Sequence, residues 1–281
     1  MQKIIKNSIF DEERALYNLC DAQVTDCRFE GVADGESALK ECRNVDVDRC
    51  SFVLRYPLWH AKGFTMRNSQ MTLTARAPIW YAENGLIENC NIESVKTLRD
   101  CKNIKIKNSK INSEEFGWKC DGIDIYDSEI EAVYFLLDTK NVNIEKLRMK
   151  GKYSFQYTEN IHIKDSVLDT KDAFWHTKNL TVENSVVKGE YLGWFSEGLT
   201  LINCHISGTQ PLCYCKDLKL IDCTMEGTDL SFEYSDVEAT VKGNIVSVKN
   251  PRSGRIKADS IGEIILENSV IDTDCKIETT L

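Results

Sequence analysis

Aromatic, cationic and titratable side chains gather between residues 55 and 100, and these are the residues whose types could do chemistry. Guanidinium groups bind carboxylates and phosphates, aromatic rings pack against sugars, and an imidazole can remove a proton at neutral pH. Together such groups could hold an anionic sugar and, in a polysaccharide lyase or a glycoside hydrolase, process it. The candidate catalytic residues are His60 and Asp100. The candidate substrate-binding residues are Arg55, Trp59, Arg76, Trp80, Tyr81 and Arg99.

Two interpretations of this region remain open. In the first, the aromatic and arginine side chains form an exposed strand face that binds or processes acidic carbohydrate, either an acidic oligosaccharide or a sugar phosphate. In the second, the tryptophans are core residues, Arg55 forms an ordinary salt bridge with Glu36, and the chain is a non-enzymatic scaffold. Such a scaffold would bind another protein through a strand face, or a second copy of itself as a homodimer. Exposed tryptophans favour the first interpretation and buried ones the second.

The composition argues against other partners and sites. The 281 residues carry 35 Lys and Arg against 44 Asp and Glu, a net charge of −9, whereas a general nucleic-acid binder needs a basic surface. We find no apolar run long enough to span a membrane and no apolar leader, so we expect a cytoplasmic protein. Twelve cysteines without such a leader predict reduced thiols. There are four histidines and no Cys-x-x-Cys pair, so we expect no metal and no cofactor.

One octapeptide pattern recurs along the chain: apolar-x-apolar-x-[Asn/Asp]-[Ser/Cys]-x-apolar. It is clear in Ile104–Ile111 and Ile123–Ile130, and we call its fifth residue the anchor. Over the central part of the chain the anchors recur at one constant spacing, at Asn89, Asn108, Asp127, Lys146, Asp165, Asn184, Asn203 and Asp222. A fixed period of about 20 residues indicates a solenoid, and apolar residues at every second position indicate strands rather than helices. We therefore predict an all-β fold, a single-stranded right-handed parallel β-helix of about 13 coils in a single domain.

The predicted boundaries follow the regularity of the repeat. Residues 1–21 are expected to cap the first coil, because an open end would expose unpaired strand edges. Residues 22–247 form the regular coils, residues 248–263 an irregular loop, and residues 264–281 a terminal coil and tail.

Further positions recur between the anchors. Fourteen residues after most anchors stands Gly, Asn or Asp, the residues that best tolerate a positive φ, so we predict a tight corner in each coil. Cysteines replace Ser, Thr or Ala at two other repeating positions, where we expect them to be small core residues. The residue before the corner alternates in charge, which predicts a column of opposite charges: Lys62, Glu83, Lys102, Asp121, Lys140, Glu159, Lys178, Glu197 and Lys216.

Two neighbouring columns carry the aromatic residues. We expect the ligand-binding site in the N-terminal half, because only there do the candidate arginines lie beside the aromatic columns. Ten residues after the anchors, allowing for a two-residue insertion, come Trp59, Trp80, Arg99, Trp118, Leu137, Gln156, Trp175 and Trp194. One residue later come His60, Tyr81, Asp100, Lys119, Asp138, Tyr157, His176, Phe195 and Tyr214.

The repeat resembles the right-handed parallel β-helix superfold of pectin lyases, pectate lyases and polygalacturonases, and the corner asparagines resemble the asparagine ladder of that group. The chain is also similar over nearly its whole length to a bacterial domain-of-unknown-function family with this fold. That resemblance implies the fold but no activity, because the family has no established catalytic residues. It is carried by Asp34–Leu39, Arg55–His60, Ala77–Tyr81, Lys171–Trp175, Gly189–Trp194 and Ser247–Pro251.

Overall fold

The computed structural model describes residues 3–31 and 36–280. The described chain divides into two compact units, with residues up to Asn143 in the N-terminal unit and residues from Ile144 in the C-terminal unit. The single domain stays a prediction. Asp34 and Gly35, which begin one block of the family resemblance, lie outside the described residues.

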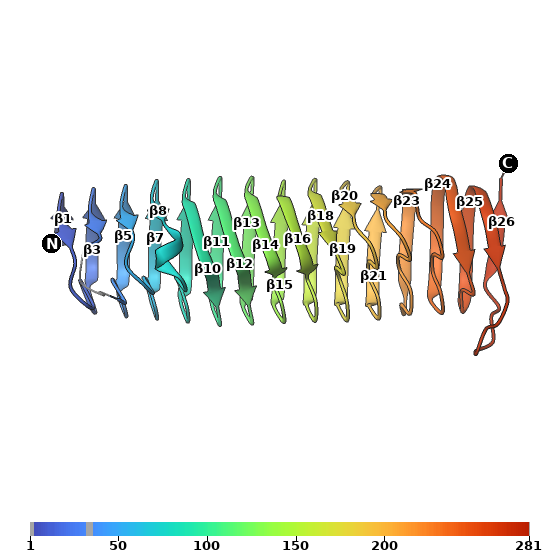
Figure 1. Ribbon diagram of the computed structural model, residues 1–281, viewed down its shortest axis with the longest axis horizontal. Helices are drawn as coiled ribbons and strands as arrows, with labels where there is room; N and C mark the ends of the chain where they lie inside the picture. The colour runs from blue at the N-terminus through green and yellow to red at the C-terminus, as the bar shows by residue number, and fades with distance from the viewer. Residues whose placement is uncertain (1–2, 32–35, 281) are drawn as a thin grey trace. The chain divides into compact units, whose positions relative to one another are not determined.

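Both units are parallel β-solenoids, with about 14 turns in all and a period near 19 residues, which confirms the all-β prediction (Figure 1). The N-terminal unit contains β1 (Lys3–Lys6), β2 (Ile9–Phe10), β3 (Cys20–Thr25), β4 (Arg28–Phe29), β5 (Arg43–Asp48), β6 (Ser51–Phe52), β7 (Lys62–Arg67), β8 (Gln70–Met71), the 3-10 helix η1 (Leu73–Ala75), β9 (Glu83–Glu88), β10 (Asn91–Arg99), β11 (Lys102–Lys107), β12 (Lys110–Trp118), β13 (Asp121–Tyr126) and β14 (Glu129–Phe135).

β15 (Lys140–Glu145) contains the division between the units. The C-terminal unit contains β16 (Arg148–Ser154), β17 (Glu159–Lys164), β18 (Val167–Lys171), β19 (Lys178–Glu183), β20 (Val186–Lys188), β21 (Glu197–Ile202), β22 (His205–Ser207), β23 (Leu218–Glu226), β24 (Asp236–Lys249), β25 (Ser253–Ile265) and β26 (Lys276–Thr279).

Equivalent residues of successive coils lie opposite one another. In the N-terminal unit β11 pairs with β13 and sets Ile104 against Ile123, and in the C-terminal unit β19 pairs with β21 and sets Leu180 against Leu199. These four side chains are buried, whereas the residue that follows each of them along its strand is exposed or half-buried. The sequence repeat thus becomes a set of columns, because residues one period apart occupy the same place in neighbouring coils.

Each regular coil contains at least four residues with a positive φ, and two of these positions are the predicted corner and the anchor. The predicted corner is confirmed, with a φ of 53° at Asn103 and 79° at Gly122. The anchor is a second corner that the sequence reasoning missed, since Asn89 and Asn108 have φ values of 54° and 46°. Amide side chains at these corners bond from coil to coil, as in the 3.0 Å bond that Asn103 Nδ2 donates to Asn84 Oδ1.

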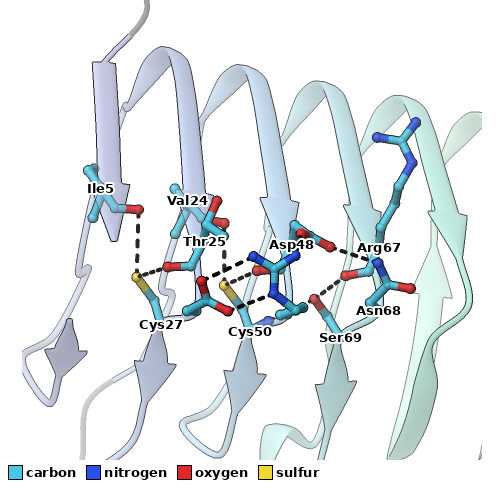
Figure 2. A network of polar contacts seen from close by, with 11 residues as sticks. Ile5, Val24, Thr25, Cys27, Asp48, Cys50, Arg67, Asn68 and Ser69 are labelled. Atoms are coloured by element: carbon cyan, nitrogen blue, oxygen red, sulfur yellow. Dashed lines mark hydrogen bonds and ion pairs between the residues drawn. The ribbon is translucent and has the colours of Figure 1, made fainter. Parts of the chain in front are cut away.

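The charge column and the cysteine positions are also confirmed. Lys62 lies opposite Glu83 in the register, and their side chains approach to 3.4 Å. All twelve cysteines are free, and ten of them are buried. Figure 2 shows Cys27 and Cys50 in successive coils, with the Cys27 thiol 3.9 Å from the carbonyl oxygen of Ile5 and the Cys50 thiol 3.4 Å from that of Val24.

Both ends of the repeat differ from the prediction. Residues 3–10 are not a cap but a further coil, because β1 pairs with β3 and β2 with β4. Asn7 continues the anchor series, with a φ of 53°. The expected loop at residues 248–263 is mostly strand β25, which pairs with β24 over nearly its whole length. Its alternating residues suit a strand despite Pro251 before it and Gly254 within it.

The described residues contain neither a helix with the length and apolar character of a membrane span nor a cluster of three metal-ligating side chains.

Candidate functional site

The candidate site is built where the repeat is irregular. The coil between the anchors Asn68 and Asn89 carries a two-residue insertion, and the additional residues form η1 and the turn that follows it. Arg76 is the centre of this turn, with φ 55° and ψ −71°. The amide of Ala77 donates to the carbonyl of Ala75 at 2.7 Å, which makes a γ-turn of the rare positive-φ form. A residue with a Cβ is strained in that conformation.

The next coil holds this strained turn in place. The backbone amides of Val95 and Lys96 both donate to the Arg76 carbonyl, at 2.9 and 2.8 Å. The Arg76 backbone is therefore fixed on both sides, while its side chain is exposed. Its guanidinium makes no hydrogen bond or ion pair with any residue that the structure describes.

Two surface hollows meet at Arg76. Arg76 is the lining residue that the two hollows share. One hollow, of about 440 Å³, is lined by Arg76 together with Val53, Leu54, Arg55, Leu73 and Thr74. The other, of about 360 Å³, is lined by Arg76 together with Tyr56, Trp59, Trp80, Val95 and Lys96.

The other cations of this region have acidic partners. Arg55 lies 3.6 Å from Glu36, so the salt bridge of the second interpretation is present. Lys96 lies 3.1 Å from Glu115, outside the hollow that it lines. Among the cations that line the two hollows, Arg76 is therefore the one without a carboxylate partner in the described residues.

The tryptophans are half-buried, between the two extremes that the sequence left open. Trp59 and Trp80 stack with their ring centroids 5.1 Å apart and their planes 7° from parallel. Their indole N–H groups donate to the carbonyls of Ala77 and Lys96, at 2.7 and 3.0 Å. Because equivalent residues lie one coil apart, each ring covers its neighbour's face, and the ring edges border the hollow.

Arg99 continues the tryptophan column. Its guanidinium carbon lies 5.1 Å from the Trp80 centroid and 5.8 Å from that of Trp118, and its Nε lies 3.5 Å from Asp100. The indole nitrogen of Trp118 is buried and has no hydrogen-bond partner among the residues that the structure describes. Both broad faces of the Arg99 guanidinium are occupied by rings, so it is held in the column rather than presented to a ligand.

The outer column lies beside the hollows. The His60 and Tyr81 rings are exposed and stack at 4.8 Å, 14° from parallel. These two residues, Arg99 and Asp100 line neither of the two hollows. The structure therefore brings Arg55, Trp59, Arg76 and Trp80 together, and it places the candidate catalytic residues outside the space that those four enclose.

Sequence reasoning missed the hollow walls made by Leu73, Tyr56 and Lys96. The signal that points to them is the two-residue insertion, since the added residues form η1 and the turn at Arg76, and both Leu73 and Arg76 are exposed.

The matching column of the C-terminal unit runs through Lys152, Lys171 and Glu190. Lys152 Nζ lies 4.6 Å from the centroid of the Tyr153 ring, and Lys171 pairs with Glu190 at 2.5 Å. Beside them, burial raises the pKa of the Asp172 carboxyl above its ordinary value.

Several solved structures are similar to this chain in fold, at low sequence identity. The A-module of mannuronan C-5 epimerase AlgE4 from Azotobacter vinelandii is 10% identical, with 99% of this chain and 87% of that chain covered and a TM-score of 0.31. PfbA, a surface adhesin of Streptococcus pneumoniae, is 12% identical, with 94% and 75% covered and a TM-score of 0.36. A GH87 alpha-1,3-glucanase catalytic domain is 10% identical, with 99% and 63% covered and a TM-score of 0.27. No curated protein matches the chain.

These identities and scores are too low to carry an argument about what the chain does. The sequence itself is more informative, because one family model, described as "Protein of unknown function (DUF3737)", matches residues 3–278. That match spans both units and the insertion that carries Arg76. The chain therefore belongs to the DUF3737 family.

Proposed function

We propose that this protein binds acidic carbohydrate, through a carboxylate or phosphate group held by Arg76. The observation that carries the proposal is the exposed guanidinium of Arg76, without a partner among the described residues, on a strained turn between two hollows. Strained backbone persists where the surroundings hold it, and it clusters at functional sites. An arginine that needs no ion pair for the fold, on a turn that costs free energy, is better explained by a ligand than by stability.

The surroundings suit a sugar acid. A guanidinium binds a carboxylate or phosphate through two parallel hydrogen bonds, which fixes the orientation of the ligand. The hollow volumes, about 440 and 360 Å³, fall within the roughly 300–1,000 Å³ of small-ligand sites. Leu73 and the edges of Trp59 and Trp80 supply apolar wall, and Lys96 supplies a further donor.

We propose that the two hollows bind the carbohydrate and do not catalyse its cleavage. His60 and Asp100 line neither hollow, so a group held by Arg76 has no proton acceptor of the predicted kind against it. The adjacent hollows would hold neighbouring units of an oligosaccharide, with Arg76 between them.

Titration calorimetry with a short oligouronate tests the proposal. We expect Arg76→Ala to weaken binding at least tenfold, Arg76→Lys to restore part of it, and the methyl-esterified oligouronate to bind as weakly as the Ala variant does. The matched control is Arg43→Ala, because Arg43 is also exposed, has no ion pair among the described residues and lies in β5 away from the hollows.

Equal affinity of the acid and its methyl ester, or equal effects of the variants at Arg76 and Arg43, would overturn the proposal. Absence of binding to every uronate and sugar phosphate tested would also overturn it, and would favour the protein-binding scaffold.

A further inference from the structure

The C-terminal unit carries an exposed aromatic ladder that the proposed function does not use. Its rings come from four successive coils and stack face to face: Tyr157 on His176 at 4.9 Å, His176 on Phe195 at 5.1 Å, and Phe195 on Tyr214 at 4.8 Å. Tyr157 is 55% exposed and Phe195 44% exposed. In the N-terminal unit the same column holds the rings of His60 and Tyr81, followed by Asp100, Lys119 and Asp138, so the longer run of rings among the described residues belongs to the C-terminal unit.

The geometry of the ladder limits its partners. The ring faces are covered by neighbouring rings, with planes 8–15° from parallel, so a sugar or nucleobase finds no free face within the ladder. What remains is a row of ring edges at the spacing of the coils, about 4.8 Å. The surface that matches such a row over several coils is another row with the same spacing, as in packed β-sheets of identical chains.

A column of alternating charges runs beside the ladder. Two residues after the rings come Glu159, Lys178, Glu197 and Lys216. The register sets Lys178 between Glu159 and Glu197, so the signs run minus, plus, minus, plus along the unit. When two copies of this series of four charges are placed side by side in opposite directions, every negative charge lies opposite a positive one.

We propose that the C-terminal unit forms a two-fold symmetric homodimer through the ladder, with the solenoid axes of the two copies antiparallel. The two-fold axis lies in the interface, perpendicular to the solenoid axis, between the coils of His176 and Phe195. His176 of one copy then faces Phe195 of the other, and Tyr157 faces Tyr214. In the same arrangement Lys178 faces Glu197, and Glu159 faces Lys216.

The charges select this arrangement over its competitors. A two-fold axis parallel to the solenoid axis would put the charge columns on opposite sides of the interface, where they could not meet. A shift of one coil in the antiparallel arrangement would bring Lys178 against Lys178 and Glu159 against Glu197. Opposed like charges cost free energy and slow association, so a shift of one coil is disfavoured. A shift of two coils restores the charge match but leaves only half of the rings facing one another, so the register without a shift is favoured.

The contact is small. Four coils at about 4.8 Å place the outermost rings roughly 15 Å apart, well below the span of a stable interface. We therefore expect reversible association with a dissociation constant on the order of micromolar to tens of micromolar at low salt, weakened by salt because the charges are exposed.

Sedimentation equilibrium of the full chain tests the surface. We expect Phe195→Glu to raise the dimer dissociation constant at least tenfold. The control is Ile221→Glu, because Ile221 is 45% exposed, lies in the same unit and is outside the ladder. A wild-type chain that stays monomeric at about 100 μM, or equal effects of the two variants, would overturn the proposal.

Charge reversal tests the register and does not depend on the Phe195 variant. Lys178→Glu should weaken the dimer at least tenfold, and adding Glu197→Lys to it should restore the wild-type constant, because the reversed pair is again complementary across the two-fold axis. A double variant as weak as the single one would overturn the antiparallel register. Carbodiimide cross-linking of mixed ¹⁴N and ¹⁵N protein should give mixed-isotope links between Lys178 and Glu197, and mixed links elsewhere alone would likewise overturn it.

Discussion

The guanidinium carbon of Arg99 lies 5.1 Å from the ring centroid of Trp80, in the coil before it, and occupies the place that an indole holds in the neighbouring coils. Trp118 covers its other face at 5.8 Å. A cation between two indoles is attracted to the negative face of each ring. The column thus continues through a charged residue without a gap, which explains why Arg99 is half-buried despite its charge.

Trp80→Ala is expected to destabilise the protein as well as to alter the hollow. The substitution removes the stack on Trp59, the contact with Arg99 and the bond to the Lys96 carbonyl. We expect the free energy of unfolding to fall by about 2–3 kcal/mol, as measured by urea titration. Trp80→Phe, which keeps a ring in the column, should lose about 1 kcal/mol. An Ala variant as stable as the wild type would show that the column contributes nothing to stability.

Arg76→Gly separates the strain of the turn from its side chain. Gly adopts the positive φ of this γ-turn without a clash of Cβ, whereas Ala keeps the strain. We expect the Gly variant to be more stable to urea than Arg76→Ala by about 1 kcal/mol, the lower end of the range for such strain. Neither variant should bind an oligouronate. A Gly variant less stable than the Ala variant would contradict the strain that we assign to this turn.

Substitutions of Asn103 test how much a left-handed corner residue contributes to stability. Asn103→Ala removes the 3.0 Å bond to Asn84 and leaves a residue with a Cβ at a φ of 53°. We expect a loss of about 1–2 kcal/mol in the free energy of unfolding. Asn103→Gly loses the same bond without the conformational cost and should be less destabilised than the Ala variant. Equal losses in the two variants would assign the whole effect to the hydrogen bond.

The buried thiols predict a loss of stability at alkaline pH. Burial raises the pKa of Cys50 to about 12, and that of Cys42 to about 12. A raised pKa means that the folded state holds the proton more tightly, so this contribution is complete below the ordinary thiol pKa and is lost as the pH rises from about 9 towards 12. The free energy of unfolding, measured by urea titration, should therefore fall across that range.

Cys50→Ser isolates this effect from the titration of lysines and tyrosines. Ser69 occupies the equivalent position one coil later, where its hydroxyl donates to the Arg67 carbonyl at 2.6 Å, so the position accepts a serine. The stability difference between the wild type and this variant should be constant below about pH 8 and should shift in favour of the variant above pH 9. Parallel pH curves for the two proteins would contradict the prediction.

Much of the candidate site could be predicted from columns alone. Trp59 and Trp80 share one repeating position, so the sequence places them against each other, and the structure stacks them at 5.1 Å. The same reasoning placed Arg55 and Arg76 together, and both line one hollow. It did not separate Arg76 from Arg55, because whether a guanidinium is paired depends on the reach of Glu36 across a coil rather than on the period.

The strand boundaries at the ends were harder to predict. Asn7 belongs to the anchor series, but only the apolar pair Ile4 and Ile5 precedes it, without the alternation seen elsewhere. β1 nevertheless pairs with β3, so the neighbouring coil supplies hydrogen-bond partners for the backbone groups of this segment. Tertiary pairing therefore overrides a weak local pattern.

The sequence by itself determined the coil, its register and the corner fourteen residues after the anchor, since residues one period apart must stack and Gly, Asn and Asp adopt a left-handed φ at little cost. The tertiary structure alone decided what the columns present to solvent. Stacking at the spacing of one coil covers the ring faces and leaves their edges, and the two-residue insertion raises Arg76 onto a strained turn between two hollows. Both outcomes depend on side-chain orientation within a coil, which the period of the repeat does not specify.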